Sequence, residues 1–364
     1  MAQQHLDPPT DPTARPAAGP VSGDALAGYL RAQATEFLRS LRQHRETGAA
    51  GNGTEDSGDA ALALRRSARR ISGTLHTFRP LLDADWSEAM RPELAWLSGT
   101  LAREHAYAAR LERLLLALHR LSGSSVFPAQ PVGAAEPVGT GPRTQPAAPE
   151  RGNLTVGAAK AGALLERQLT LARTRAHSAA LQALGSSRFH AVADSVAVLA
   201  SEVPLTPAAA TADLRPLAAA AEERLCDAVA ALPLIVAGHP YNAEALIHGL
   251  SPDPAPHPQD GPWHQVRLLL RLHRYAREVL YGEYGEHGEK AAVDVRLLAA
   301  GQALNRHRDA SEAAAAAAAA ARTPRIAPAT AYALGVLHAD QRHEVEAARF
   351  AFQQAWQRQT VGTP

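Results

Sequence analysis

Apolar residues recur along most of the chain at the three- and four-residue spacing of an α-helix, without the alternation of a β-strand. In residues 59–79, for example, Leu64, Ile71, Leu75 and Phe78 lie within about 60° of one another on a helical projection. The same spacing predicts helices over 22–47, 59–79, 85–121, 154–184, 262–281, 289–322 and 328–359, with a broken helical segment over 187–232. No period-two alternation persists, so we predict an all-α protein.

Segments rich in proline and glycine separate these helices. Residues 1–20 are rich in Pro, Ala and Thr without periodicity, which predicts a disordered tail. Residues 122–153 form a long Pro/Gly-rich stretch that we interpret as a disordered loop, and shorter loops are expected at 48–58 and 250–262. We predict that the chain consists of a first helical half, 21–185, and a second, 186–364. The helices between the Pro/Gly-rich segments have the lengths found in bundles.

The two halves share a spacing of basic residues. Arg65 and Arg69 in the first half are spaced like Arg267 and Arg271 in the second, and residues 101–105 are similar to 304–309. One arginine-bearing helix in each half predicts two four-helix bundles related by a pseudo-twofold internal repeat and connected by long Pro/Gly loops.

The helix predicted over 262–281 carries the strongest chemical signal. It is mostly apolar, but a band about 80° wide on its surface holds four basic side chains. These are His264, Arg267, Arg271 and Arg274. A guanidinium among leucines costs several kcal/mol unless an anion meets it. Either internal carboxylates such as Asp309 and Glu278 pair with these arginines, or the band receives a polyanion, and spacing alone leaves both readings open.

Composition limits the classes of function. Lys and Arg total 37 against 36 Asp and Glu, and the net charge of +1 predicts no general attraction to nucleic acid or membranes. The aromatic content of 5% favours closely packed helices of Ala, Leu and Val. A single cysteine, Cys226, excludes a disulfide framework or a thiolate zinc cluster, and we expect no metal site and no cofactor. With no signal peptide or membrane-spanning run, we expect a cytoplasmic protein.

Catalytic motifs are missing from the sequence. It contains no glycine-rich nucleotide-binding loop and no Gly-x-Ser-x-Gly elbow. Residues 283–290 lack the alternating Glu-x-Glu-x-Lys of triphosphate tunnel enzymes. We therefore predict that the protein is not an enzyme.

Both arginine-bearing helices resemble the CHAD family, the conserved-histidine α-helical domain, over roughly residues 22–359. Its second-half motif, a histidine followed by spaced basic residues, is matched by His264, Arg267, Arg271, Arg274 and Tyr275. Its later Leu-Gly-x-x-x-Asp-Ala segment is similar to residues 304–310, with Asn305 in place of the glycine. The first half matches at Arg65, Arg69, Arg70, Phe78, Arg79, Pro80, Leu81 and Leu82. It departs at Leu62, where the family has histidine, and at residues 105–106, His-Ala in place of Arg-Asp.

This resemblance implies one CHAD-like domain that binds inorganic polyphosphate, without catalysis, in a basic seam between the halves. It also implies association with polyphosphate granules. The side chains expected to contact phosphate are Arg65, Arg69, Arg70, His264, Arg267, Arg271, Arg274 and Arg308. Asp309 is expected to orient a nearby arginine rather than to act as an acid or base.

Two other classes of function remain open at this level. A helical protein-interaction scaffold would hold its arginines in internal ion pairs and would be indifferent to polyphosphate. A phosphohydrolase would need clustered carboxylates and a divalent metal, and is the weaker alternative.

Overall fold

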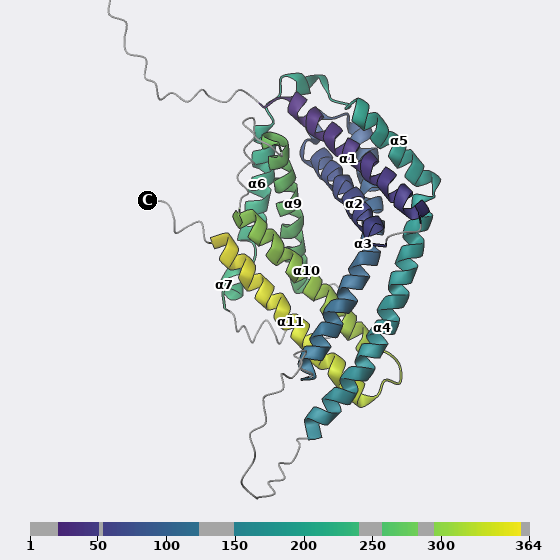
Figure 1. Cartoon of the computed structure of the whole chain (residues 1–364). Helices are drawn as coiled ribbons and strands as arrows, with labels where there is room; N and C mark the ends of the chain where they lie inside the picture. The colour runs from purple at the N-terminus through teal and green to yellow at the C-terminus, as the bar shows by residue number, and fades with distance from the viewer. Residues whose placement is uncertain (1–20, 51–53, 124–148, 240–256, 283–294, 358–364) are drawn as a thin grey trace, which may run out of the picture.

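The computed structural model describes residues 21–50, 54–123, 149–239, 257–282 and 295–357 (Figure 1). Within these ranges the regular structure is helical, and the one β-type contact is an isolated bridge between Leu82 and Leu205. The predicted all-α class is confirmed. The predicted tail, 1–20, lies outside the described residues, as does most of the loop predicted at 122–153.

The helices follow one another in the order that periodicity predicts. The first group is α1 (Gly23–Ala50), α2 (Thr54–Thr77), the short 3₁₀-helix η1 (Arg79–Leu81), α3 (Ala84–Leu121), α4 (Pro149–Leu184) and α5 (Ser187–Ser201). The second group is η2 (Pro207–Ala210), α6 (Arg215–Ala230), α7 (Leu234–Ala237), η3 (Pro258–Asp260), α9 (Gly261–Tyr281), α10 (Val295–Ala321) and α11 (Pro328–Gln357).

Two of the predicted loops are shorter than expected. Helix α1 continues to Ala50 and α2 begins at Thr54, so most of the loop predicted at 48–58 is helical. Helix α4 begins at Pro149, inside the loop predicted at 122–153. Proline suits the first position of a helix because its missing N–H needs no partner there. A few glycines near a helix end cost only about 1 kcal/mol each, which the continuing helix offsets.

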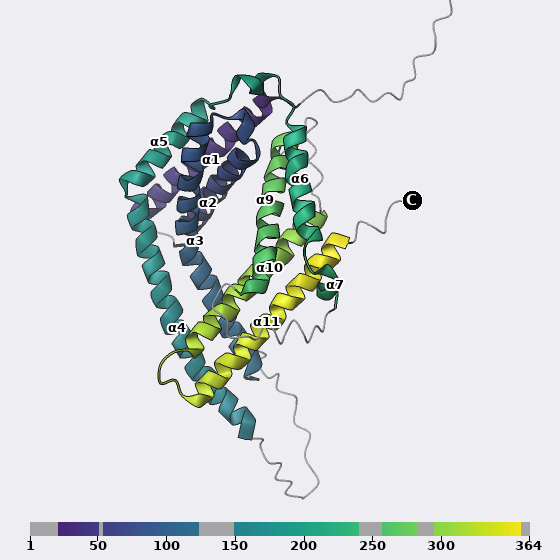
Figure 2. The same ribbon diagram turned by 180° about the vertical axis from the view of Figure 1, so that it is seen from behind.

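The apolar side chains form three clusters. One joins α1, α2, the first part of α3 and α5, together with the start of α6 and the end of α9. Another joins α6 and α7 to the facing parts of α9, α10 and α11. The third lies where the second part of α3 and α4 cross α10 and α11 (Figures 1 and 2).

This third cluster means that the two groups of helices share a core at one end. Helix α5, on the carboxyl side of the predicted division at 185/186, packs against α1. The internal repeat and the division into two halves stay predictions. Within the described part of the chain, no helix combines the length and the apolarity needed to cross a bilayer.

Helices α2 and α9, which carry the two arginine lines, approach each other closely. The approach depends on Gly73 in α2, because a Cβ atom there would lie 2.6 Å from Cδ2 of Tyr275 in α9. A larger residue at position 73 would have to displace the Tyr275 ring or separate the two helices. The tight contact therefore fixes where the arginine lines face one another.

Candidate functional site

A cavity of about 540 Å³ lies between α2 and α9, beside this tight contact. Six arginines and a single carboxylate line it among the described residues. The charged lining residues are Arg66, Arg69 and Arg70 from α2, and Arg267, Arg271, Arg274 and Glu278 from α9. Leu270, Tyr275, Gly301 and Asn305 complete the wall. We call this space the seam cavity.

Four arginines at or next to the seam cavity share one environment: Arg69, Arg267 and Arg271 line the cavity, whereas Arg65 does not line it but lies near Arg271. Arg65 and Arg69 are one turn apart on α2, and Arg267 and Arg271 are one turn apart on α9. Side chains four residues apart lie on the same face of a helix. We call these four residues the seam arginines. Their spacing on each helix follows from the sequence, whereas their meeting follows from the packing of α2 against α9.

The seam arginines are not neutralised within the described part of the chain. None of the ion pairs found there includes Arg65, Arg69, Arg267 or Arg271. Arg267 Nε donates to Asn305 Oδ1 at 2.8 Å, which is an uncharged acceptor. The Nε atoms of Arg65 and Arg69 are buried without a hydrogen-bond partner. These two donors are therefore not satisfied by the described part of the protein.

Burial and mutual repulsion change the proton affinity of these side chains. Burial, followed by the charges of Arg308 and Arg271, lowers the pKa of Arg267 to about 9. Burial and the neighbouring Arg65 lower the pKa of Arg69 to about 10. The pKa values of Arg65 and Arg271 are lowered as well, with burial again the main cause. All four remain cationic at neutral pH, so the site is a cluster of partly desolvated like charges.

A second group of buried arginines, on α11, forms ion pairs with carboxylates of the protein. Arg342 Nη1 lies 2.8 Å from Asp260 Oδ2, and Arg349 Nη2 lies 2.7 Å from Asp260 Oδ1. Arg349 Nη1 also pairs with Glu346 at 2.7 Å. Burial alone would raise the pKa of Asp260, but contacts with His307 and Arg342 outweigh it and hold that pKa well below its usual range. Two carboxylates thus neutralise two guanidiniums. The seam arginines differ in lacking this compensation.

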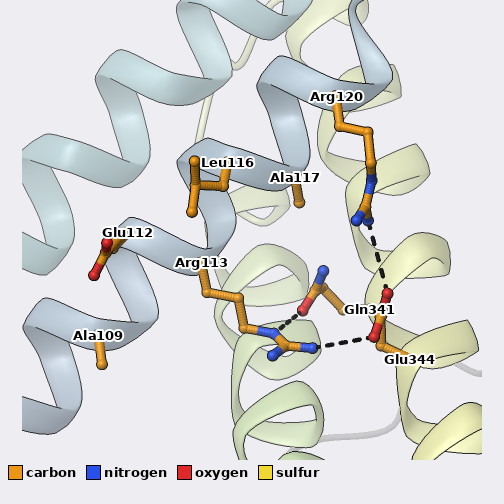
Figure 3. A pocket seen from close by; sticks show the side chains of 8 residues that line it. All are labelled: Ala109, Glu112, Arg113, Leu116, Ala117, Arg120, Gln341 and Glu344. Atoms are coloured by element: carbon orange, nitrogen blue, oxygen red, sulfur yellow. Dashed lines mark hydrogen bonds and ion pairs between the residues drawn. The ribbon is translucent and has the colours of Figure 1, made fainter. Parts of the chain in front are cut away.

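Another cavity, of about 380 Å³, lies between α3 and α11 (Figure 3). Its arginines already have partners. Arg113 Nε donates to Gln341 Oε1 at 2.6 Å and pairs with Glu344 at 3.6 Å. Arg120 lies 3.9 Å from Glu344 and 2.8 Å from Asp340. This cavity therefore lacks the unpaired charge that would favour a polyanion.

The structure brings most of the predicted site residues together. In the described part of the chain, some of these arginines have a carboxylate partner and others do not. Arg274 lines the seam cavity with an exposed side chain. Arg70 lines it too, but its Nε lies 2.9 Å from Oε2 of Glu278. Arg308 donates from Nε to Asp309 Oδ1 at 2.9 Å and lies 3.8 Å from Glu312. Internal pairing by acidic residues thus applies to Arg70 and Arg308, but not to the seam arginines.

His264 lies between the seam arginines and the Asp260 group. Its ring meets that of His307 edge-on at 5.5 Å, and its Nε2 is buried without a partner. Burial is the main cause that lowers the pKa of His264, with Arg267 adding to the effect and Asp260 opposing it. The phosphate-contact role of His264 and the orienting role of Asp309 stay predictions.

Several residues of this region are not predicted from the sequence. Arg66 also lines the seam cavity. The Asp260 group, with His307, Arg342 and Arg349, was not predicted. Arg342 and Arg349 are seven residues apart on α11, a spacing that would place them on one face. Their partner Asp260, however, is 82 and 89 residues away in the chain.

Metal-binding side chains are not clustered in the described ranges. No group of three or more His, Cys, Asp or Glu there is placed to hold a metal ion. What the cavity offers instead is guanidinium groups, which can bind anions.

Comparison with known proteins places this arrangement in a family. The family model described as the CHAD domain matches residues 32–318. The chain is also similar to a solved structure, "PptA from Streptomyces chartreusis", with 70% sequence identity and a TM-score of 0.73. That similarity covers 93% of this chain and 100% of the other. The comparison with curated proteins gives no match. Because the family model spans most of the sequence, the chain belongs to the CHAD domain family.

Proposed function

We propose that the seam cavity binds inorganic polyphosphate, or a similar linear phosphate chain, without cleaving it. The observation that carries this proposal is the set of four seam arginines, three lining the cavity and Arg65 next to it, which come from two helices and lack a carboxylate partner in the described part of the chain. The resemblance of both arginine lines to the CHAD family, together with the family match, supports the same ligand.

The chemistry of phosphate suits these side chains. Guanidinium groups donate two parallel hydrogen bonds to phosphate oxygens, and such charge-assisted bonds are stronger than neutral ones. At about 4 Å and an effective dielectric constant near 20, each arginine–phosphate contact contributes roughly 4 kcal/mol of Coulomb energy before desolvation. Part of the desolvation cost is already met, because these arginines are partly buried in the free protein. A linear polyanion carries charge along its length and can therefore contact arginines from both helices.

The kind of side chain in the cavity supports the proposal of binding without cleavage. A general base needs a pKa near the working pH, and guanidinium groups lie well above it. Glu278, the carboxylate of the lining, already contacts Arg70 and Tyr29. An association of this protein with polyphosphate granules in the cytoplasm is part of the proposal.

An internally paired interaction scaffold is the second candidate function. The ion pairs Arg70–Glu278 and Arg308–Asp309 favour it. It does not account for the seam arginines, and it predicts that polyphosphate changes neither stability nor any other property of the protein.

Polyphosphate of defined length is expected to raise the melting temperature of the protein, and the increase should shrink as salt is added. Linear polyanions release counterions when they bind. For single-stranded nucleic acids, log K falls by about 0.7 per unit of log salt concentration for each phosphate contact. Four arginine contacts therefore predict a slope of about −3. Thermal-shift titrations at a series of salt concentrations measure it.

Orthophosphate at the same total phosphorus concentration is the control for this titration, and it should stabilise far less. A melting temperature indifferent to polyphosphate contradicts the proposal and favours the scaffold. Shortening of the chain during incubation, seen by gel electrophoresis, contradicts binding without cleavage.

Polyphosphate affinity is expected to rise as the pH falls from neutral to mildly acidic values. The pKa of His264 is lowered in the free protein, so its ring is neutral at pH 7. A phosphate beside the ring favours its protonated form and raises this pKa. At a pH between the pKa of His264 in the free protein and that in the complex, binding therefore takes up a proton. Below the pKa that His264 has in the free protein, a further fall in pH adds nothing to the affinity through this ring.

Calorimetry in buffers of different ionisation enthalpy measures this proton uptake. The variant His264→Gln should keep the binding but lose the uptake that the ring contributes. Equal uptake in both proteins would show that the phosphate chain or another group is the one that titrates.

A further inference from the structure

We infer that Glu278 ends the phosphate path at one side of the seam cavity and keeps Arg70 out of it, which makes Glu278 a specificity-determining residue. This inference rests on the proposed function. It assigns Arg70 a different role from the seam arginines, although Arg70 stands next to Arg69 on α2 and lines the same cavity.

Glu278 is held in place by contacts with side chains of two other helices. Its Oε2 accepts a hydrogen bond from the Tyr29 hydroxyl at 2.8 Å and lies 2.9 Å from Arg70 Nε. Arg70 Nη2 reaches Oε1 at 3.5 Å. The contact therefore joins α1, α2 and α9, and the Arg70 and Glu278 side chains are only 21% and 18% exposed. Burial and the Glu278 carboxylate raise the pKa of Tyr29, so its hydroxyl stays a donor.

Glu278 lies on the same face of α9 as two of the seam arginines. Arg267, Arg271, Tyr275 and Glu278 follow at intervals of four, four and three residues, so they share one face of the helix. The cations occupy the first two positions, Tyr275 packs at the tight contact with Gly73, and the carboxylate comes next. A phosphate chain lying along Arg267 and Arg271 thus meets a negative charge beyond Tyr275.

Arg70 cannot bind phosphate in the way that the seam arginines can, because of its contact with Glu278. Nε and Nη2 of its guanidinium face Glu278, so bringing these donors to phosphate would leave that carboxylate half-buried with the Tyr29 hydroxyl. A buried carboxylate that loses its charged partner pays a large desolvation cost. Phosphate in that place would also be repelled by Glu278. Arg70 is therefore engaged by the protein, whereas Arg69 is free to bind.

A double-mutant cycle tests this assignment in the full chain, with inorganic polyphosphate of defined length as the probe at one fixed salt concentration. Arg70→Ala alone should bind within about threefold of the native protein. Glu278→Gln should bind about tenfold or more tightly, because it removes a repulsion and removes the charged contact between this position and Arg70. Adding Arg70→Ala to Glu278→Gln should abolish most of that gain.

Two further variants serve as comparators. Glu344→Gln removes the same charge from the cavity between α3 and α11, so it should leave polyphosphate affinity unchanged. Arg69→Ala removes a seam arginine from α2 and should weaken binding much more than Arg70→Ala. If Glu278→Gln fails to fold, this comparison decides alone: equal losses for Arg69→Ala and Arg70→Ala overturn the inference, and unequal losses in the stated order support it.

The failure of this inference differs from the failure of the proposed function. Native or weaker affinity in folded Glu278→Gln, with the native protein still binding polyphosphate, overturns the role of Glu278 and leaves the seam cavity as the site. Absence of binding in every protein of the cycle overturns both. The gain from Glu278→Gln should also be larger for a long chain than for tripolyphosphate, since an extended path benefits the longer ligand.

Discussion

Replacing both Arg267 and Arg271 by methionine is expected to abolish polyphosphate binding while leaving the free protein at least as stable as before. A hydrogen bond to a charged group contributes about 1.5–3 kcal/mol. Losing two such contacts therefore weakens binding by roughly a hundredfold to more than ten-thousandfold. Methionine keeps the length and much of the apolar stem of arginine, so the packing around Leu270 changes little.

The expected gain in stability follows from the sign of the pKa shifts. The pKa of Arg267 is lowered to about 9 in the folded protein, with burial as the main cause and repulsion from Arg308 and Arg271 next. The folded state thus holds this proton less tightly than the unfolded state does, and the charge opposes folding at every pH below about 9. An uncharged side chain removes that opposition. The hydrogen bond from Arg267 to Asn305 is lost in exchange.

Melting curves with and without polyphosphate measure both effects in one experiment. The double variant Arg42→Met/Arg215→Met is the matched control, because it removes the same two charges from exposed ion pairs. It should bind polyphosphate nearly as well as the native protein. Unchanged binding in folded Arg267→Met/Arg271→Met rejects the seam as the site, and a clear loss of stability rejects the view that its charges are uncompensated.

Replacing Asp260 by asparagine is expected to lower the free energy of unfolding by about 3–5 kcal/mol, the usual cost of leaving buried charges unpaired. Asp260 is fully buried and accepts hydrogen bonds from Arg342, Arg349 and the Ser311 hydroxyl. Asparagine keeps the shape but removes the charge that both guanidiniums contact, leaving Arg349 with Glu346 alone as a charged partner. Urea unfolding of the full chain measures the change.

The same carboxylate predicts how stability depends on pH. The folded pKa of Asp260 lies below its unfolded value, so its contribution is fully present above the unfolded pKa, near 4. It is lost as the pH falls toward the folded pKa. The acid-induced loss of stability should therefore be smaller in Asp260→Asn. Asp213→Asn, which removes a carboxylate from an exposed pair with Arg215, is the control and should change stability little. An equal effect in the two variants would contradict the structural role of Asp260.

Arg267→Met/Arg271→Met and Asp260→Asn each remove charge from a group of partly or fully buried arginines. The two groups differ in whether carboxylates of the protein pair with them. Arg342 and Arg349 have carboxylates of their own, so loss of a partner destabilises the fold. Arg267 and Arg271 have none in the described residues, so their charge is retained at a cost to the fold. The proposed ligand-binding site would account for a cost of this kind, and an internally paired scaffold would not.

Local periodicity in the sequence determined the helices and the lines of arginine on them. Helix α9 was predicted over 262–281 and begins at Gly261, and the spacings of Arg65 from Arg69 and of Arg267 from Arg271 placed each pair on one face. Helix ends near glycine were predicted less well, at 48–58 and 149–153, because helix continuation there depends on small local preferences. The resemblance to the CHAD family, also read from these residues, is confirmed.

Only the tertiary structure decided which arginines are neutralised. Glu278, 208 residues from Arg70 in the chain, pairs with it, while the neighbouring Arg69 is left without a carboxylate. Asp260 meets Arg342 across 82 residues, a contact to which no spacing in the sequence points. The physical reason is that helical periodicity fixes the direction of a side chain from its own helix. Its charge partner, by contrast, depends on which distant helix packs against it.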